Sequence, residues 1–113
     1  MDLTEKEKKI RKETKRLKEI FAGLEPNKLK AVDSLIARAA FITVSLQELE
    51  QELNKKGWTE VYINGKNQGG IKKAAAAEAH ISLTKNLTTI MKQLLDLVPP
   101  AQKASRLAEM MTR

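Results

Sequence analysis

The chain has 113 residues and no cysteine, which excludes a disulfide scaffold and thiolate metal sites. A chain of this length forms one domain that buries only part of its surface, so oligomerisation is a natural supplement to its stability. The N-terminus is charged and no stretch approaches the roughly 20 apolar residues of a membrane span, so we expect a soluble cytoplasmic protein.

The formal charge of +7 is unevenly distributed along the chain. Residues 1–20 carry eight basic and five acidic side chains, residues 21–70 carry six of each, and residues 71–113 carry seven basic and three acidic. Basic ends around a balanced middle suit contact with a polyanion. The alternative is that the charge only keeps the protein soluble.

The first predicted helix covers about residues 5–22. Thr4 followed by Glu7 matches a capping box, in which each side chain satisfies a backbone N–H of the first turn. Its apolar residues recur every seven positions, which predicts a narrow contact seam. The seam comprises Leu3, Ile10, Leu17 and Leu24.

The opposite side of this helix is basic at 100° per residue. One hypothesis is a solvated face, because Glu5 and Lys9, and Glu7 and Arg11, stand at the favourable i,i+4 spacing. The other is that the face binds the phosphates of duplex DNA, through Lys8, Arg11, Lys12, Lys15 and Arg16.

The second predicted helix covers about residues 27–55 and carries the clearest pattern in the chain. Gly23 is suited to end the first helix, and Pro26 suits the first turn of the second. A helix-turn-helix with Gly23 in its turn also fits this junction. The heptad seam runs through Val32, Leu35, Ala39, Ile42, Leu46, Leu49 and Leu53.

A polar connector, residues 57–73, follows. The Asn64-Gly65 pair favours a type I′ turn, because both positions of that turn need positive φ. Val61 and Ile63 alternate with polar residues at strand period before the turn. After it, Gly69-Gly70 is expected to interrupt the pattern, so we predict a small, irregular β-hairpin.

The third predicted helix covers about residues 74–97. Its apolar face is wide enough to pack on the second helix and leave surface for another chain, which favours a homo-oligomer. His80 lies on this apolar face. We expect it to be a buried, hydrogen-bonded histidine, because no cluster of metal ligands accompanies it. The residues assigned to oligomerisation are Leu46, Leu49, Leu53, Trp58, Tyr62, Met91 and Leu95.

Residues 99–113 form a separable tail after Pro99-Pro100. One hypothesis is a frayed, disordered end. The other is a short helix over about residues 101–111 whose apolar edge, Leu107, Met110 and Met111, docks on a partner.

The sequence offers no constellation for catalysis. It contains no phosphate-binding glycine loop, and its three aspartates are scattered. Glu48 and Glu52 share a helix face but are expected to be solvated and charged, not to hold a divalent ion. We therefore expect no enzyme, no cofactor and no metal.

Three stretches in this order resemble the phage terminase small subunit family. They are Leu3-Thr4-Glu5-Lys6-Glu7, the connector with Asn64-Gly65 and its following Asn-Gln, Gly and basic pair, and Met91 to Pro99. One departure is the run Ala74-Ala75-Ala76-Ala77, where members of the family commonly place a proline at the start of the last helix.

The resemblance implies a role in viral DNA packaging. Members form rings or related oligomers, recognise the viral DNA at the start of packaging, and present it to the large subunit, which carries the ATPase and nuclease. It implies double-stranded viral DNA and the terminase large subunit as partners, with Leu107, Met110 and Met111 docking on the latter, in the cytoplasm of the bacterial host.

We therefore predict an all-α, oligomeric protein. Its parts are a basic N-terminal helix over 1–24, a long antiparallel helical hairpin over 25–98 and the tail over 99–113. Two other functional hypotheses remain open: a self-assembling helical scaffold and a small helix-turn-helix regulator.

Overall fold

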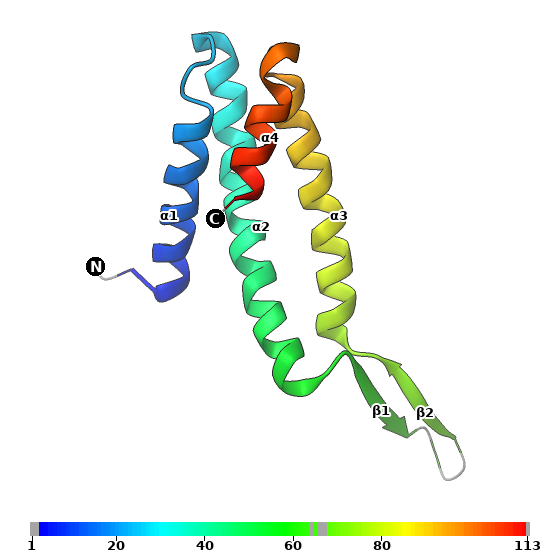
Figure 1. Ribbon diagram of the computed structural model, residues 1–113. Coiled ribbons are helices and arrows are strands. Elements are labelled where there is room, and N and C mark those ends of the chain that lie inside the picture. The colour runs from blue at the N-terminus through cyan, green and yellow to red at the C-terminus, as the bar shows by residue number, and fades with distance from the viewer. Residues whose placement is uncertain (1–2, 64, 66–67, 113) are drawn as a thin grey trace.

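The computed structural model describes residues 3–63, 65 and 68–112, and it is mostly helical. Figure 1 shows an elongated bundle with a two-stranded antiparallel sheet projecting from one end. The order of elements is α1 (Glu5–Ile20), α2 (Pro26–Lys56), β1 (Thr59–Ile63), β2 (Gly69–Lys73), α3 (Ala75–Asp96), a 3-10 turn (Pro100–Gln102) and α4 (Lys103–Met111). The predicted helical hairpin with a β-type connector is confirmed, and each long helix begins and ends within two residues of its predicted bounds.

The capping box predicted at the start of α1 is present. The Thr4 hydroxyl accepts from the Glu7 N–H at 3.1 Å, and the Glu7 carboxylate accepts from the Thr4 N–H at 3.0 Å. At the other end, α1 stops at Ile20, and the Phe21 side chain turns into the core, where it is 1% exposed. Both ends of α1 are thus fixed by local contacts.

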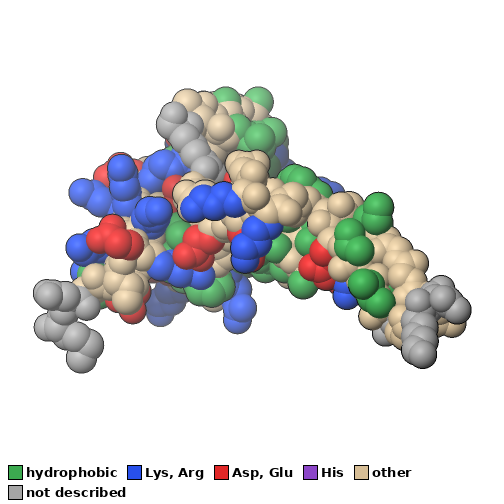
Figure 2. All heavy atoms as spheres, turned by 90° about the horizontal axis from the view of Figure 1, so that it is seen from below, with side chains coloured by type: hydrophobic (Ala, Val, Ile, Leu, Met, Phe, Trp, Pro, Cys, Tyr) green, Lys and Arg blue, Asp and Glu red, His purple; other side chains and the backbone are tan. Residues whose placement is uncertain are grey.

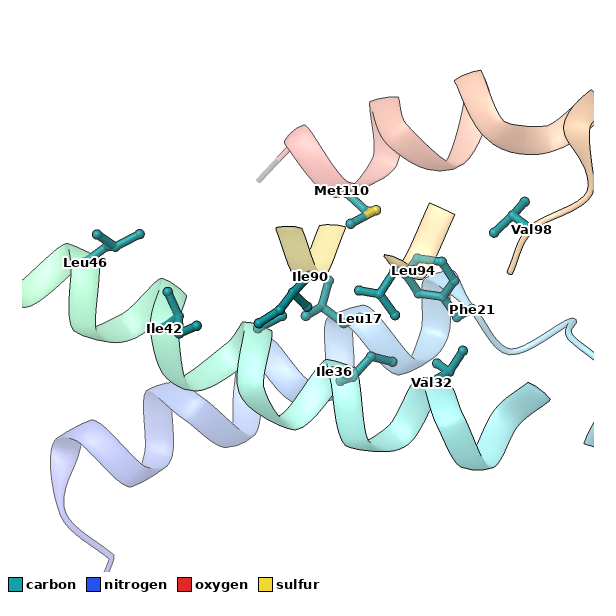
Figure 3. Packing of buried hydrophobic residues seen from close by; sticks show 11 residues of the cluster. Leu17, Phe21, Val32, Ile36, Ile42, Leu46, Ile90, Leu94, Val98 and Met110 are labelled. Carbon is teal, nitrogen blue, oxygen red and sulfur yellow. The ribbon is translucent and has the colours of Figure 1, made fainter. Parts of the chain in front are cut away.

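The core lies along α2, which packs against α1 on one side and α3 on the other (Figure 1). Figure 3 shows side chains from α1, α2, α3 and α4 converging on one apolar cluster. The buried members are Leu17, Phe21, Val32, Ile36, Ala39, Ile42, Leu46, Ile90, Leu94, Val98 and Met110. Helical periodicity places these residues on facing stripes, and their burial holds the bundle together.

Several residues predicted to mediate oligomerisation are buried or half-buried within the single chain instead. Leu46 is 8% exposed and Leu53 is 1% exposed, so both are buried within the single chain. Met91 and Leu95 are half-buried and pack against the same core, and Leu49 is also half-buried. The heptad seam therefore joins α2 to α3 intramolecularly, and only Trp58 and Tyr62 of the assigned set are exposed.

The two strands form a regular hairpin, contrary to the predicted irregularity. Gly69 and Gly70, expected to interrupt the pattern, pair in β2 with Ile63 and Tyr62. A Cβ on Gly70 would lie 3.2 Å from the Tyr62 hydroxyl oxygen, so the missing side chain leaves room for the tyrosine ring over the strand. The predicted two-residue type I′ turn does not match the register, because Ile63 pairs with Gly69 and five residues separate them. Gly65 has φ +78°, in the left-handed region that favours glycine. Asn64 lies outside the described residues.

The tail is an ordered helix, so the disordered alternative is not what the structure shows. α4 folds back beside α1 and α3, and Met110 enters the core at 7% exposure (Figure 1). α1 and α2 lie side by side and antiparallel, unlike the crossed pair of a helix-turn-helix. Within the described part of the chain, no helix is both long and apolar enough for a membrane crossing.

Replacing Leu94 with alanine should lower the free energy of unfolding by about 2–5 kcal/mol, because Leu94 is completely buried among α1, α2 and α4 residues. Chemical denaturation followed by helical circular dichroism measures the change. The matched control is Leu107→Ala in α4, where the side chain is 41% exposed and the expected loss is about 0.5 kcal/mol or less. Equal losses at the two sites would contradict the described core.

Candidate nucleic-acid interface

The outward face of α1 presents four exposed basic side chains: Lys8, Arg11, Lys12 and Lys15. They lie on the side of the helix opposite Leu17, which is buried against α2. Figure 2 shows Lys and Arg side chains gathered around the α1 side of the molecule, with a few acidic ones between them. The sequence-predicted basic face is therefore exposed at these four positions.

Few of these charges are used in ion pairs. Lys8 lies 3.4 Å from the Glu5 carboxylate, and both side chains are more than half exposed, so this pair contributes little energy. Within the described residues, Arg11, Lys12 and Lys15 form no ion pair. Glu7, the expected partner of Arg11, instead caps the Thr4 N–H. The positive charge of this face is thus largely free to meet an external anion.

Arg16 has a different role from the other four predicted DNA-binding residues. Its guanidinium donates to the backbone oxygens of Glu109 at 3.1 Å, Thr112 at 3.1 Å and Met110 at 3.2 Å. It also donates to Glu13 at 2.6 Å. Glu109 and Met110 lie in the last turn of α4 and Thr112 is its C-cap, and helix geometry leaves carbonyl oxygens there without partners. Arg16 therefore holds α4 against α1, and it is not part of the proposed phosphate-binding set.

A groove of about 620 Å³ runs between α1 and α2 beside this contact. Lys9 and Lys12 line it from α1, and Val44 and Gln47 line it from α2. Glu13 and Glu19 also line it, so its charge is mixed. Sequence periodicity placed Lys9 at the flank of the basic face, but nothing in the sequence indicated that Gln47 lies opposite it.

Lys6 contacts α2 at the surface. Its ammonium lies 2.9 Å from the Glu48 carboxylate and 4.7 Å from the centre of the Phe41 ring. These groups are partly exposed, so the contacts contribute little energy. The burial of Leu17 and Phe21 orients α1 about its own axis. The outward direction of the basic face follows from this orientation.

The three residues assigned to large-subunit docking separate in the structure. Met110 is buried in the core, so it is not available as an exposed docking residue. Leu107 is 41% exposed and Met111 is 69% exposed. Met111 borders a hollow of about 230 Å³ whose lining includes Leu87 and Met91 of α3.

The remaining polar candidates serve local contacts. His80 Nε2 lies 3.1 Å from Glu50, and the histidine ring meets the edge of Trp58 at 5.4 Å, so His80 is hydrogen-bonded as expected but only half-buried. Glu52 pairs with Lys56 at 3.3 Å. No group of three or more potential metal ligands occurs among the described residues.

Comparison of the chain with protein-family models, with curated proteins and with solved structures found no match in any of the three.

Replacing Arg16 with lysine should loosen α4, because a single ammonium does not reproduce the forked contact with three carbonyls and Glu13. We expect amide hydrogen exchange in residues 103–112 to speed up by about tenfold. Mass spectrometry of peptides from this region measures it.

The matched control is Arg11→Lys, the same change at an exposed arginine of the same helix. It should leave the exchange of α4 unchanged. An unchanged exchange rate in the Arg16 variant would mean that this contact does not hold α4.

Proposed function

We propose that this chain is the small subunit of a viral DNA-packaging terminase, which binds viral duplex DNA and presents it to the large subunit. Two observations support this assignment. Three stretches of the sequence resemble the family in the same order along the chain, and the basic face of α1 is exposed. The second carries the DNA-binding part, because four cations lie outward on a helix whose other face is fixed in the core.

The proposed contact is with the phosphate backbone. Lys8, Arg11, Lys12 and Lys15 lie along about two turns of α1, a spacing suited to several phosphates and not to one isolated anion. Each neutralised phosphate releases counterions, so affinity should depend steeply on salt. Long, exposed side chains of this kind position a protein on DNA and carry little sequence information. Specificity would then come from DNA shape or from several subunits acting together.

Self-association strengthens such binding. One copy offers four cations, and several copies held together turn separate weak contacts into one tight contact. We therefore propose a homo-oligomer as the binding form. The chemistry of packaging belongs to the large subunit, and in this proposal the present chain is not an enzyme and holds no cofactor.

The proposed docking surface for the large subunit comprises two of the three residues predicted from the sequence. Leu107 and Met111 are exposed on α4, next to each other at helical spacing i,i+4. Met110 serves instead to anchor α4 in the core. A short helix with two exposed apolar side chains suits insertion into a groove of a partner protein.

A self-assembling scaffold without DNA binding is the second candidate function. The observation that favours it is the large exposed apolar surface of the β-hairpin, which suits association and has no connection with DNA. The helix-turn-helix regulator is less well supported, because α1 and α2 are antiparallel neighbours.

The joint replacement of Lys8, Arg11, Lys12 and Lys15 by alanine should weaken duplex binding at least tenfold near physiological salt. It should also reduce the salt slope, by about 3 to 4 for each subunit in contact with DNA. Titration of a labelled duplex at several salt concentrations measures both quantities.

A variant with the same loss of charge provides the control: Lys30, Lys55, Lys85 and Lys92 changed to alanine, all exposed and all outside α1. This variant should keep most of the affinity. If both variants lose affinity equally, the net charge of the protein determines duplex binding, and the α1 face has no special part in it. If neither loses affinity, duplex binds elsewhere on the molecule and the proposed α1 contact is wrong. If the wild type does not bind duplex, the scaffold hypothesis gains over the terminase proposal.

A further inference from the structure

The β-hairpin has two chemically different faces. On one face, Glu60 and Lys72 form an ion pair at 3.3 Å, and the Lys72 ammonium lies 5.9 Å from the centre of the Tyr62 ring. Tyr62 in turn lies over Gly70. The polar groups of this face are therefore largely satisfied by one another.

The other face is apolar and exposed. Val61 is 76% exposed, Ile63 is 80% exposed and Ile71 is 72% exposed. Val61 and Ile71 stand directly opposite each other in the strand register, so the three side chains form one continuous surface. Figure 2 shows hydrophobic side chains along the projecting end of the molecule, away from the helical core. Nothing in the described part of the chain covers this face.

The apolar face continues into a hollow where the hairpin joins α3. This hollow has a volume of about 350 Å³, and its apolar lining comes from Trp58, Ile71, Ala77 and Ile81, while Thr59, Lys72 and Lys73 also line it. The Trp58 and His80 rings meet edge-on, with their centroids 5.4 Å apart. One end of the face is thus a projecting side chain, Ile63 near the tip, and the other end is a recess.

A two-stranded hairpin is marginally stable in water unless another layer covers its apolar face. Here the free face carries β-branched side chains at high exposure, which favours burial on assembly. Because the same face contains both a projection and a recess, it is suited to pair with a copy of itself in the opposite direction.

We infer that the apolar face of the β-hairpin is a contact surface between two copies of this chain, related by a two-fold axis. Ile63 of each copy enters the hollow formed by Trp58, Ile71 and Ile81 of the other, and the Val61–Ile71 pairs meet at the centre. Such a contact is isologous, because each copy contributes the same surface. The inference rests on the self-association in the proposed function and is independent of DNA.

The exposed apolar area is large enough for a contact with a second copy. With roughly 150 Å² for each aliphatic side chain and roughly 250 Å² for tryptophan, the exposed fractions of Val61, Ile63, Ile71, Trp58 and Ile81 leave about 500 Å² per copy. Two copies would bury about 1,000 Å² in total, which is at the lower limit for a specific interface.

Val61→Lys tests the inference by placing a charge at the centre of the contact. Because a two-fold contact joins copies in pairs, its loss should halve the mass of the native particle, measured by light scattering or native mass spectrometry. Ala37→Lys is the control, the same added charge at an exposed position of α2, and it should leave the mass unchanged. An unchanged mass in the Val61 variant, or a wild-type particle that is already a single chain, overturns the inference.

Cysteine pairs test the orientation, since the chain has no cysteine of its own. A mixture of Ile63→Cys and Ile81→Cys chains should form a disulfide between copies under mild oxidation. Ile63→Cys alone should not, because the two Ile63 positions lie at opposite ends of the paired hairpins. Cross-linking in the single variant but not in the mixture contradicts the antiparallel arrangement.

Duplex binding distinguishes this inference from the proposed function. The four α1 cations are present in the Val61 variant, so each copy should still bind duplex. The affinity should fall only because fewer copies bind the duplex together. Halved mass with retained binding supports both ideas. If the mass halves but neither the variant nor the wild type binds duplex, the contact between copies is established and the DNA-binding role is refuted.

Discussion

The packing of α1 on α2 determines where the proposed DNA-binding surface lies. Leu17 and Phe21 enter the core, so the rotation of α1 about its own axis is fixed, and Lys6 adds a surface contact with Glu48 and Phe41. A helix held in this way has one face for the core and one for solvent. The outward position of the basic residues is therefore a consequence of core packing, and any weakening of this contact would also disorganise the charged surface.

The basic residues of α1 have separate tasks despite their similar chemistry. Lys6 and Arg16 are structural: one joins α1 to α2, and the other holds the last turn of α4. Lys8, Arg11, Lys12 and Lys15 are exposed, and they carry the charge that an external polyanion would meet. Arginine suits the α4 contact because its planar fork reaches several carbonyls at once. Charge counting along the sequence does not make this distinction.

Helical periodicity predicted much of the fold from sequence, since the seven-residue spacing of α2, the capping box at Thr4 and the break at Gly57 act locally. Gly23, expected to end the first helix, lies beyond its end, because Phe21 caps α1. Tertiary contacts decided the rest. A heptad seam does not reveal whether its partner is the same chain or another, so the sequence alone assigns Leu46 and Leu53 to oligomerisation, whereas both are buried within the single chain. The contact between Arg16 and α4 spans more than 90 residues, and no local pattern announces it.

In the proposed function, the outward face of α1 meets duplex DNA and α3 does not. Acetylation of lysines, with and without duplex and read by mass spectrometry, tests it directly on the unaltered protein. We expect duplex to protect Lys8, Lys12 and Lys15 and to leave Lys85 and Lys92 of α3 as reactive as before. Protection that is absent, or that is as strong on α3 as on α1, would contradict this account.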